Sequence, residues 1–204
     1  MDKYDIIATK LRDYQPNVYG VRRVSSVVIP LIEVDGETHI LYEKRSSKLR
    51  MQPGDISFPG GRKEEGETER ETAIRETCEE LGIRADQMEI LGRIDSLNTS
   101  FENLIHCFVA RIRVDFASLR PSEDEVEELF TVPLRWLQAH EPQRYRVSSH
   151  FVMSDDFPFE YIPNGRNYDF RGASYPVLIY PYGDRIIWGL TARLTELFLR
   201  IERA

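Results

Sequence analysis

Three glutamates stand close together in one short acidic stretch: Glu76, Glu79 and Glu80. Arg75 immediately precedes them, and a Gly60-Gly61 pair lies shortly upstream. Hard cations such as Mg²⁺ bind to a few carboxylate oxygens together with water and substrate phosphate. These residue types therefore predict a site that holds a divalent cation and, through it, a phosphate group.

A helix is expected to present these carboxylates. Thr68 and Glu71 have the spacing of a capping box, and Gly82 suits the position just past a helix end. A helix over about residues 69–81 follows. At about 100° per residue the three glutamates fall on one face, with Arg75 at its border. The opposite face carries Ile74, Thr77, Cys78 and Leu81.

An ordinary amphipathic helix with a solvated acidic face is the simpler explanation of a glutamate triplet alone. The flanking residues favour a functional site, because seven positions match one fixed spacing: Gly61, Glu67, Arg75, Glu76, Glu79, Glu80 and Gly82. This spacing resembles the Nudix box, G-x5-E-x7-R-E-U-x-E-E-x-G-U, in which U is aliphatic. The one departure is Thr77, which lies on the apolar face and so affects packing more than chemistry.

The residues upstream of the box indicate which branch of the Nudix family this sequence resembles. Residues 41–61 resemble the signature L-L-T-x-R-[SA]-x3-R-x3-G-x3-F-P-G-G of the coenzyme A pyrophosphatase branch of Nudix hydrolases. The matching residues are Arg45, Ser46, Arg50, Gly54, Phe58, Pro59, Gly60 and Gly61. With Arg45 aligned, Tyr42 replaces the second leucine and Glu43 stands where threonine is usual. Residues 187–192 resemble the segment that opens the last helix of this branch.

Two features depart from that branch and leave alternatives open. The acidic stretch at 63–68 is closer to generic Nudix proteins, and the strand expected at 103–109 lacks a proline. An ADP-ribose or nucleoside-diphosphate-sugar pyrophosphatase is the alternative enzyme. A Nudix-fold sensor that binds a nucleotide without turnover is the alternative outside catalysis. The intact glutamate set argues against the sensor, because binding alone does not require three carboxylates on a metal.

The resemblance implies metal-dependent hydrolysis of the diphosphate linkage of coenzyme A or its derivatives, giving 3′,5′-ADP and 4′-phosphopantetheine. The implied cofactor is Mg²⁺ or Mn²⁺. Glu76 and Glu80 are the implied first metal ligands, and Glu79 either completes the metal's ligand set or acts as the base. Glu67 would serve a second metal or stabilise the loop.

Further residues receive roles from the same resemblance. Arg75 is expected to orient Glu79 through an ion pair, since it precedes it by four residues. Glu125 is a candidate catalytic base, although it is also explained as the solvated start of an acidic helix. Gly60 and Gly61 would let the chain turn sharply beside the diphosphate. The remaining candidates contact substrate phosphate through forked donors, and they are Arg45 and Arg50.

Composition predicts one domain, residues 1–204, because 204 residues with 41% hydrophobic content suffice for one sizeable core. The net charge of −7 argues against nucleic-acid binding, so the expected partner is a small molecule.

No apolar stretch approaches the roughly 20 residues that span a bilayer. Cys78 and Cys107 have no disulfide or zinc spacing, so a cytoplasmic protein is expected. The sequence leaves open whether the protein forms a homodimer, because it contains no heptad pattern that would predict one.

The expected architecture is an α/β Nudix-type α/β/α sandwich with a mixed sheet and a loop–helix–loop catalytic motif. Apart from the helix at 69–81, helices are expected at 4–14, 123–130, around Trp136, and at 190–203. Strands are expected at 25–33, 38–43, 56–58, 89–94, 104–114, 145–153, 159–162 and 175–180. Asp35-Gly36 predicts a hairpin between the first two strands. The aromatic-rich stretch 154–174 is expected to form a long loop or an insertion near the site, and its rings are explained either by a substrate pocket or by packing in the core.

Overall fold

A seven-stranded mixed sheet lies at the centre of the computed structural model, which describes residues 2–99, 102–170 and 172–203. Its strands run in the order β3-β2-β1-β6-β5, with β4 paired to β1 and β7 paired to β2. The β1–β6 pair is parallel, whereas the remaining pairs are antiparallel. The strands are β1 Arg23–Val34, β2 Glu37–Arg45, β3 Ile56–Ser57, β4 Gly60–Arg62, β5 Met88–Asn98, β6 Asn103–Ile112 and β7 Val126–Pro133.

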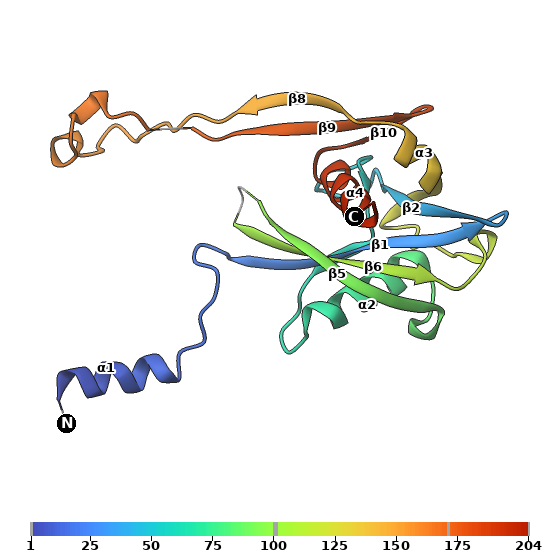
Figure 1. Ribbon diagram of the computed structural model, residues 1–204, viewed down its shortest axis with the longest axis horizontal. Coiled ribbons are helices and arrows are strands. Elements are labelled where there is room, and N and C mark those ends of the chain that lie inside the picture. The colour runs from blue at the N-terminus through green and yellow to red at the C-terminus, as the bar shows by residue number, and fades with distance from the viewer. Residues whose placement is uncertain (1, 100–101, 171, 204) are drawn as a thin grey trace.

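Two helices cover the two faces of this sheet (Figure 1). Helix α2, Glu69–Leu81, packs Ala73 and Leu81 into an apolar cluster with β1 and β6. Helix α4, Gly189–Glu202, packs on the opposite face in a cluster that includes Tyr42. Buried apolar side chains on both faces supply the main driving force for this arrangement. The expected α/β/α sandwich is therefore confirmed.

A second, three-stranded antiparallel sheet packs against α4 and covers it from outside (Figure 1). Its strands are β8 Gln143–Ser148, β9 Ser174–Tyr182 and β10 Arg185–Trp188. Leu178 and Ile187 join the same apolar cluster as α4. The sequence pattern missed β10, which has only four residues and shows little period-two alternation.

The predicted helix start, helix end and hairpin turn, which depend on residues close together in the sequence, are confirmed. Thr68 and Glu71 form the reciprocal capping box that starts α2, and Gly82 ends it in the left-handed conformation. Asp35 and Gly36 both have positive φ, 51° and 77°, as a tight two-residue hairpin turn requires.

The acidic helix expected at 123–130 is wrong. Residues Val126–Pro133 form strand β7, which pairs antiparallel with β2 from Arg45 back to His39. Val126, Phe130 and Val132 are buried in this pairing. Burial of these side chains in the sheet outweighs the local helical preference of the glutamates.

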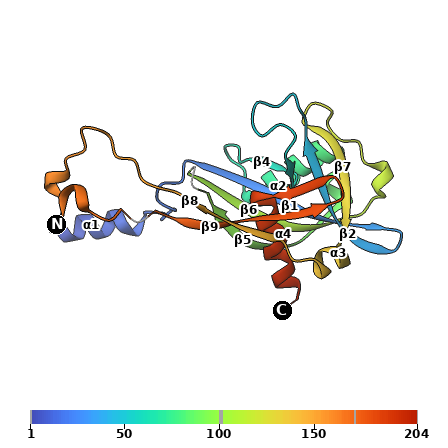
Figure 2. The ribbon, with the colours of Figure 1, turned by 90° about the horizontal axis from the view of Figure 1, so that it is seen from above.

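The strand expected at 159–162 is also wrong, because Phe159–Tyr161 is a short 3-10 turn. It belongs to the long loop between β8 and β9, which projects from the outer end of these strands, away from α2 (Figures 1 and 2). The expected position of this loop near the site is therefore wrong. Its rings pack on one another instead: the Phe157 and Phe159 centroids lie 4.9 Å apart, and those of Tyr168 and Phe170 lie 4.8 Å apart.

Two short helices complete the structure. Helix α1, Lys3–Arg12, has no buried residue and projects from the sandwich, while α3, Leu134–Ala139, follows β7 (Figure 2). Short 3-10 turns lie at Ala85–Gln87, Phe116–Ser118 and Gly165–Asn167. Within the described ranges no helix has the length and apolar character needed to cross a membrane. A single domain over residues 1–204 stays a prediction.

Gly82→Ala is expected to destabilise the protein more than Gly36→Ala. Both glycines have positive φ, 64° and 77°, so each alanine meets backbone strain of about 1–2 kcal/mol. A Cβ at Gly82 would additionally lie 1.8 Å from the carbonyl oxygen of Arg120, whereas no described atom lies within 4 Å of one at Gly36. Urea unfolding of the two variants measures the difference. Equal losses of unfolding free energy would contradict the proposed clash.

Candidate active site

The sharp turn expected at Gly60 and Gly61 is wrong, because both residues lie in the short strand β4, which pairs with β1. This strand brings two glutamates of α2 against the sheet. The backbone N–H of Gly60 donates a 2.7 Å hydrogen bond to Oε2 of Glu80. A Cβ on Gly61 would lie 2.4–2.5 Å from the carboxylate atoms of Glu76. A Cβ on Gly60, where φ is 148°, would lie 2.3 Å from the carbonyl oxygen of Ser26. Both glycines are therefore needed for this close approach, as expected from their position in the sequence.

The expectation that all three glutamates lie opposite the apolar face of the helix is wrong for Glu80. Glu79 is exposed, but Glu80 is only 5% exposed and belongs to the face of α2 that contacts the sheet. The hydrogen bond from Gly60 gives this buried carboxylate a donor, so the polar group is tolerated there.

Arg75 binds the other box carboxylates in one network. Its Nε and Nη2 donate to the two oxygens of Glu67 at 2.7 and 3.1 Å. Its Nη1 donates to Glu76 at 2.8 Å and to Glu79 at 3.3 Å, so the expected ion pair with Glu79 is present. The hydrogen bonds from Arg75 lower the pKa of Glu67 to about 2. Glu67 is thus held as a carboxylate that joins the loop to the helix.

The sequence analysis missed one carboxylate of the site, Glu43. It lies on β2 and is 1% exposed, and its Oε1 accepts a 2.8 Å hydrogen bond from Ser57 Oγ. Its Oε2 is buried and has no hydrogen-bond partner among the described residues. In the sequence, its only signal is a departure from the coenzyme A pyrophosphatase signature. Its place in the site depends on the pairing of β2 with β3.

The buried carboxylates disfavour one another's charge. Burial raises the pKa of Glu80, and the nearby charge of Glu43 raises it further. Burial likewise raises the pKa of Glu43, with Ser57 and Arg45 opposing the shift and Glu125 adding to it. Burial is also the main reason that the pKa of Glu76 is raised. Several acidic groups from separate segments therefore share one electrostatic environment.

Glu125 joins this environment from the turn before β7. Its backbone oxygen accepts a 2.8 Å hydrogen bond from Ser46 N, and its charge raises the pKa of Glu43, Glu76 and Glu80. The turn is also tied to α2, since Ser122 N donates to the carbonyl oxygen of Glu80 at 3.2 Å. The structure thus brings the candidate base Glu125 close to the Nudix box. Glu125 does not begin a helix, because it lies in the turn before strand β7.

The donor set fits a hard divalent cation. Glu76 and Glu80 offer carboxylate oxygens, and the unpartnered Oε2 of Glu43 is a further oxygen within the same environment. Across the described residues, no three His, Cys, Asp or Glu side chains are already arranged as a complete metal-binding group. Arg75 and Gly60 hold the box carboxylates, so metal binding requires some of these side chains to turn.

The predicted phosphate-binding arginines lie at one end of β2. Arg45 closes the strand, and its Nε is buried without a partner among the described residues, while Nη2 donates to Met51 O at 3.4 Å. Arg50 is exposed on the following loop. A pocket of about 720 Å³ lies between this loop and the turn before β7, lined by Lys44, Ser46, Ser47, Lys48, Pro53, Gly54, Glu123, Val126 and Glu127.

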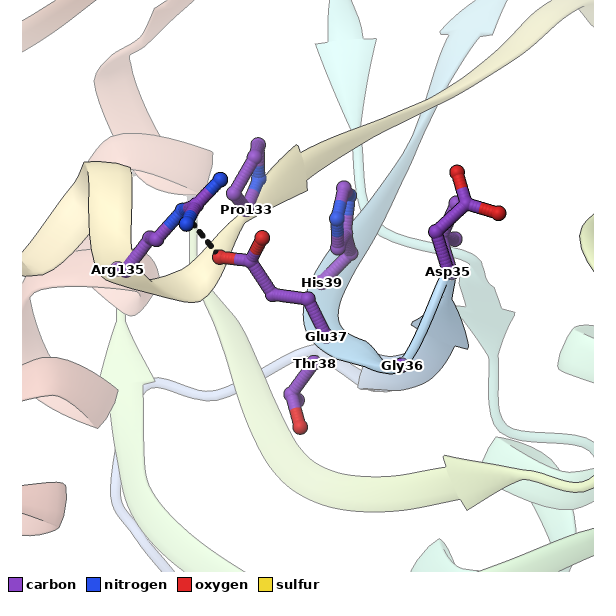
Figure 3. Close-up of a pocket in the computed structure, with 8 residues that line it drawn as sticks. Asp35, Gly36, Glu37, Thr38, His39, Pro133 and Arg135 are labelled. Carbon is purple, nitrogen blue, oxygen red and sulfur yellow. Dashed lines mark ion pairs between the residues drawn. The ribbon is translucent and has the colours of Figure 1, made fainter.

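Another pocket, of about 830 Å³, lies at the opposite end of β2, around the β1–β2 hairpin (Figure 3). An ion pair of 2.6 Å joins Arg135 and Glu37 beside it, and His39 lies against its wall. None of the box carboxylates lines this pocket. We therefore place the candidate active site where Gly60 and Gly61 of strand β4 meet α2.

The sequence matches the family model of the NUDIX domain over residues 21–151. The chain belongs to the Nudix family. It is 42% identical to Nudix hydrolase 3 of Caenorhabditis elegans over 113 residues, which are 53% of this chain and 47% of that protein. The match thus spans about half the length of that relative.

This Nudix hydrolase also resembles the mitochondrial coenzyme A diphosphatase NUDT8 of Homo sapiens. The two are 31% identical over 180 residues, which are 87% of this chain and 68% of the human protein. A MutT/nudix family protein from Enterococcus faecalis has a similar fold, with a TM-score of 0.53 and 14% identity over 100% of this chain and 70% of that one. The expected family and its fold are confirmed. The roles of individual residues and a cytoplasmic location stay predictions.

Metal-free protein is expected to lose stability as the pH rises from about 5 to about 8, and Glu80→Gln is expected to weaken this loss. The folded protein raises the pKa of Glu80 above its ordinary value of 4.5, so folding binds a proton in this range and stability falls as the proton is released. Melting temperatures in EDTA measure the trend.

Glu33→Gln is the control, because Glu33 is exposed on β1. The comparison of each variant with the wild type cancels the titration of the histidines and cysteines. A pH trend that is the same in all three proteins would contradict the burial of a charged Glu80.

Proposed function

We propose that this Nudix hydrolase cleaves the diphosphate linkage of coenzyme A or its derivatives to give 3′,5′-ADP and 4′-phosphopantetheine. One observation carries the proposal: the segment with the coenzyme A pyrophosphatase signature, residues 41–61, leads directly into the carboxylate site. The likeness to human NUDT8, which extends over 87% of this chain, supports the same substrate.

The fold gives this signature a physical role in positioning its arginines. Arg45 N donates to Asp55 O at 2.9 Å, and Gly54 N donates to Arg45 O at 3.1 Å, so the intervening loop returns to the end of β2. Arg50 lies on this loop. We assign Arg45 and Arg50 to the phosphates of the substrate, because a guanidinium offers forked donors to phosphate oxygens.

The box residues would prepare the site for hydrolysis. Glu76 and Glu80 are the proposed ligands of Mg²⁺ or Mn²⁺, which when bound neutralises the diphosphate and lowers the pKa of a water molecule. Arg75 holds the exposed Glu79 in place. Glu79 or Glu125 would accept a proton from the attacking water on a carboxylate oxygen. Gly60 and Gly61 leave room for the diphosphate beside β4.

Incubation of the protein with Mg²⁺ or Mn²⁺ is expected to release 3′,5′-ADP from coenzyme A in preference to products from ADP-ribose or a dinucleoside polyphosphate. Glu80→Gln is expected to reduce this rate by at least about 100-fold, since loss of a metal-site residue weakens metal binding or activity by this order. Product analysis by chromatography measures both results. Glu33→Gln serves as the matched control and is expected to keep full activity.

Two other results of the product analysis would contradict the proposal, and each would support one of the alternative functions. Preferential cleavage of ADP-ribose would identify the chain as a pyrophosphatase of that class. Tight binding of nucleotides without any product would identify a Nudix-fold sensor.

Arg50→Met is expected to raise the KM for coenzyme A about tenfold and to leave the KM for 3′-dephospho-coenzyme A unchanged. A hydrogen bond to a charged group contributes about 1.5–3 kcal/mol, and only the first substrate carries the 3′-phosphate. Steady-state kinetics with the two substrates measures the difference. Arg70→Met, at an exposed position on α2, is the control. A similar increase in KM for both substrates would rule out specific contact with the 3′-phosphate.

A further inference from the structure

Strand β2 places in the active site a carboxylate that neither the Nudix box nor the upstream signature contains. We propose that Glu43 is a further ligand of the divalent cation, supplied by β2 alongside the ligands from α2. This inference rests on the proposed metal-dependent function, and it concerns this chain in particular. The signature usually has threonine at this position, so Glu43 adds one carboxylate to the site.

The burial of Glu43 is the first support. The side chain is 1% exposed, and only one of its two oxygens accepts a hydrogen bond, from Ser57 Oγ. The second oxygen, Oε2, is buried and has no partner among the described residues. A buried carboxylate oxygen without a donor is unfavourable, because the lost hydration is not replaced. A cation bound at Oε2 would replace it.

The guanidinium of Arg45, a positively charged group close to Glu43 in the sequence, does not donate a hydrogen bond to Glu43 Oε2. Arg45 follows two residues later on β2, beyond a register shift in the pairing with β7, and its charge opposes the rise in the pKa of Glu43. Its Nε is itself buried and without a partner among the described residues, and its Nη2 donates to Met51 O. Two groups of opposite charge thus lie near each other without a hydrogen bond between Arg45 Nε and Glu43 Oε2.

The position of Glu43 relative to α2 is the second support. Ser57, its hydrogen-bond donor, lies three residues before Gly60, which is the donor to Glu80. The carboxylates of β2 and α2 are therefore held by the same short segment. Glu43 is near enough to disfavour the charge of Glu80. A divalent cation between them would turn this repulsion into two attractive contacts.

The buried position of Glu43 also favours a role as a metal ligand over a role as the catalytic base. A base must receive a proton from water and release it to solvent, and the exposed Glu79 and Glu125 are suited to this exchange. Glu43 is only 1% exposed, and its strand β2 is paired with β3 and with β7 at this position. An enclosed carboxylate held by a hydrogen bond on one oxygen presents the other in a fixed direction, as a metal ligand requires.

The experiment measures the binding of Mn²⁺ alone to the full chain, after removal of metal with EDTA, by electron paramagnetic resonance and calorimetry. Glu43→Gln is expected to weaken Mn²⁺ binding at least about tenfold relative to the wild type. It is also expected to raise the melting temperature of the metal-free protein, because it removes a buried charge, and to reduce the increase in melting temperature that Mn²⁺ produces.

Matched variants make the result specific. Glu33→Gln, on the adjacent strand β1, is expected to bind Mn²⁺ like the wild type, and Glu80→Gln is expected to bind it weakly. Glu43→Thr introduces the residue that the signature usually has, and circular dichroism checks that each variant is folded. If Glu43→Gln does not fold, the same weakening is expected of Glu43→Thr.

Wild-type affinity in a folded Glu43 variant would overturn the inference, as would a wild-type protein that binds no Mn²⁺. The readout does not depend on the substrate. Normal Mn²⁺ binding, weakened by Glu43→Gln, together with no cleavage of coenzyme A would reject the proposed substrate and still support Glu43 as a ligand.

Discussion

The hydrogen bond from the Gly60 amide to the Glu80 carboxylate is the contact on which the rest of the site depends. It joins strand β4 to the C-terminal half of α2. A side chain at Gly61 would clash with Glu76 of α2, and one at Gly60 would clash with the backbone of β1, so both glycines permit the close packing around this bond. Because Glu80 lies on the face of α2 that contacts the sheet, this bond also gives a buried charge one of its few donors. The position of the helix and the chemistry of the site are therefore decided together.

A second constraint is the excess of negative charge that this approach creates. Arg75 partly balances it by contacting Glu67, Glu76 and Glu79, which fixes the loop before α2 as well as the helix itself. The carboxylates closest to the sheet, Glu43 and Glu80, receive no such contact from Arg75. The outer part of the site is thus balanced by the protein's own arginine, whereas the charged forms of the inner carboxylates are disfavoured and a divalent cation would stabilise them.

The parts of the molecule that project from the sandwich are separate from this chemistry. Helix α1 buries no residue, and the loop beyond β8 and β9 packs its aromatic side chains among themselves. The active-site elements instead lie where β2, β4 and α2 meet. This explains why a loop rich in aromatic residues resembles a substrate pocket in sequence but does not line one near α2 in the structure.

The sequence by itself determined the features that depend on neighbouring residues. The capping box at Thr68 and the left-handed Gly82 fix the bounds of α2, and Asp35-Gly36 fixes a hairpin, since their hydrogen bonds and φ angles are local. The spacing of the Nudix box likewise predicted the family. Only the tertiary structure decided the rest. Strand β7 forms because a distant strand pairs with it, and Glu43 and Glu80 come near each other because one short segment, from Ser57 to Gly60, donates hydrogen bonds to both.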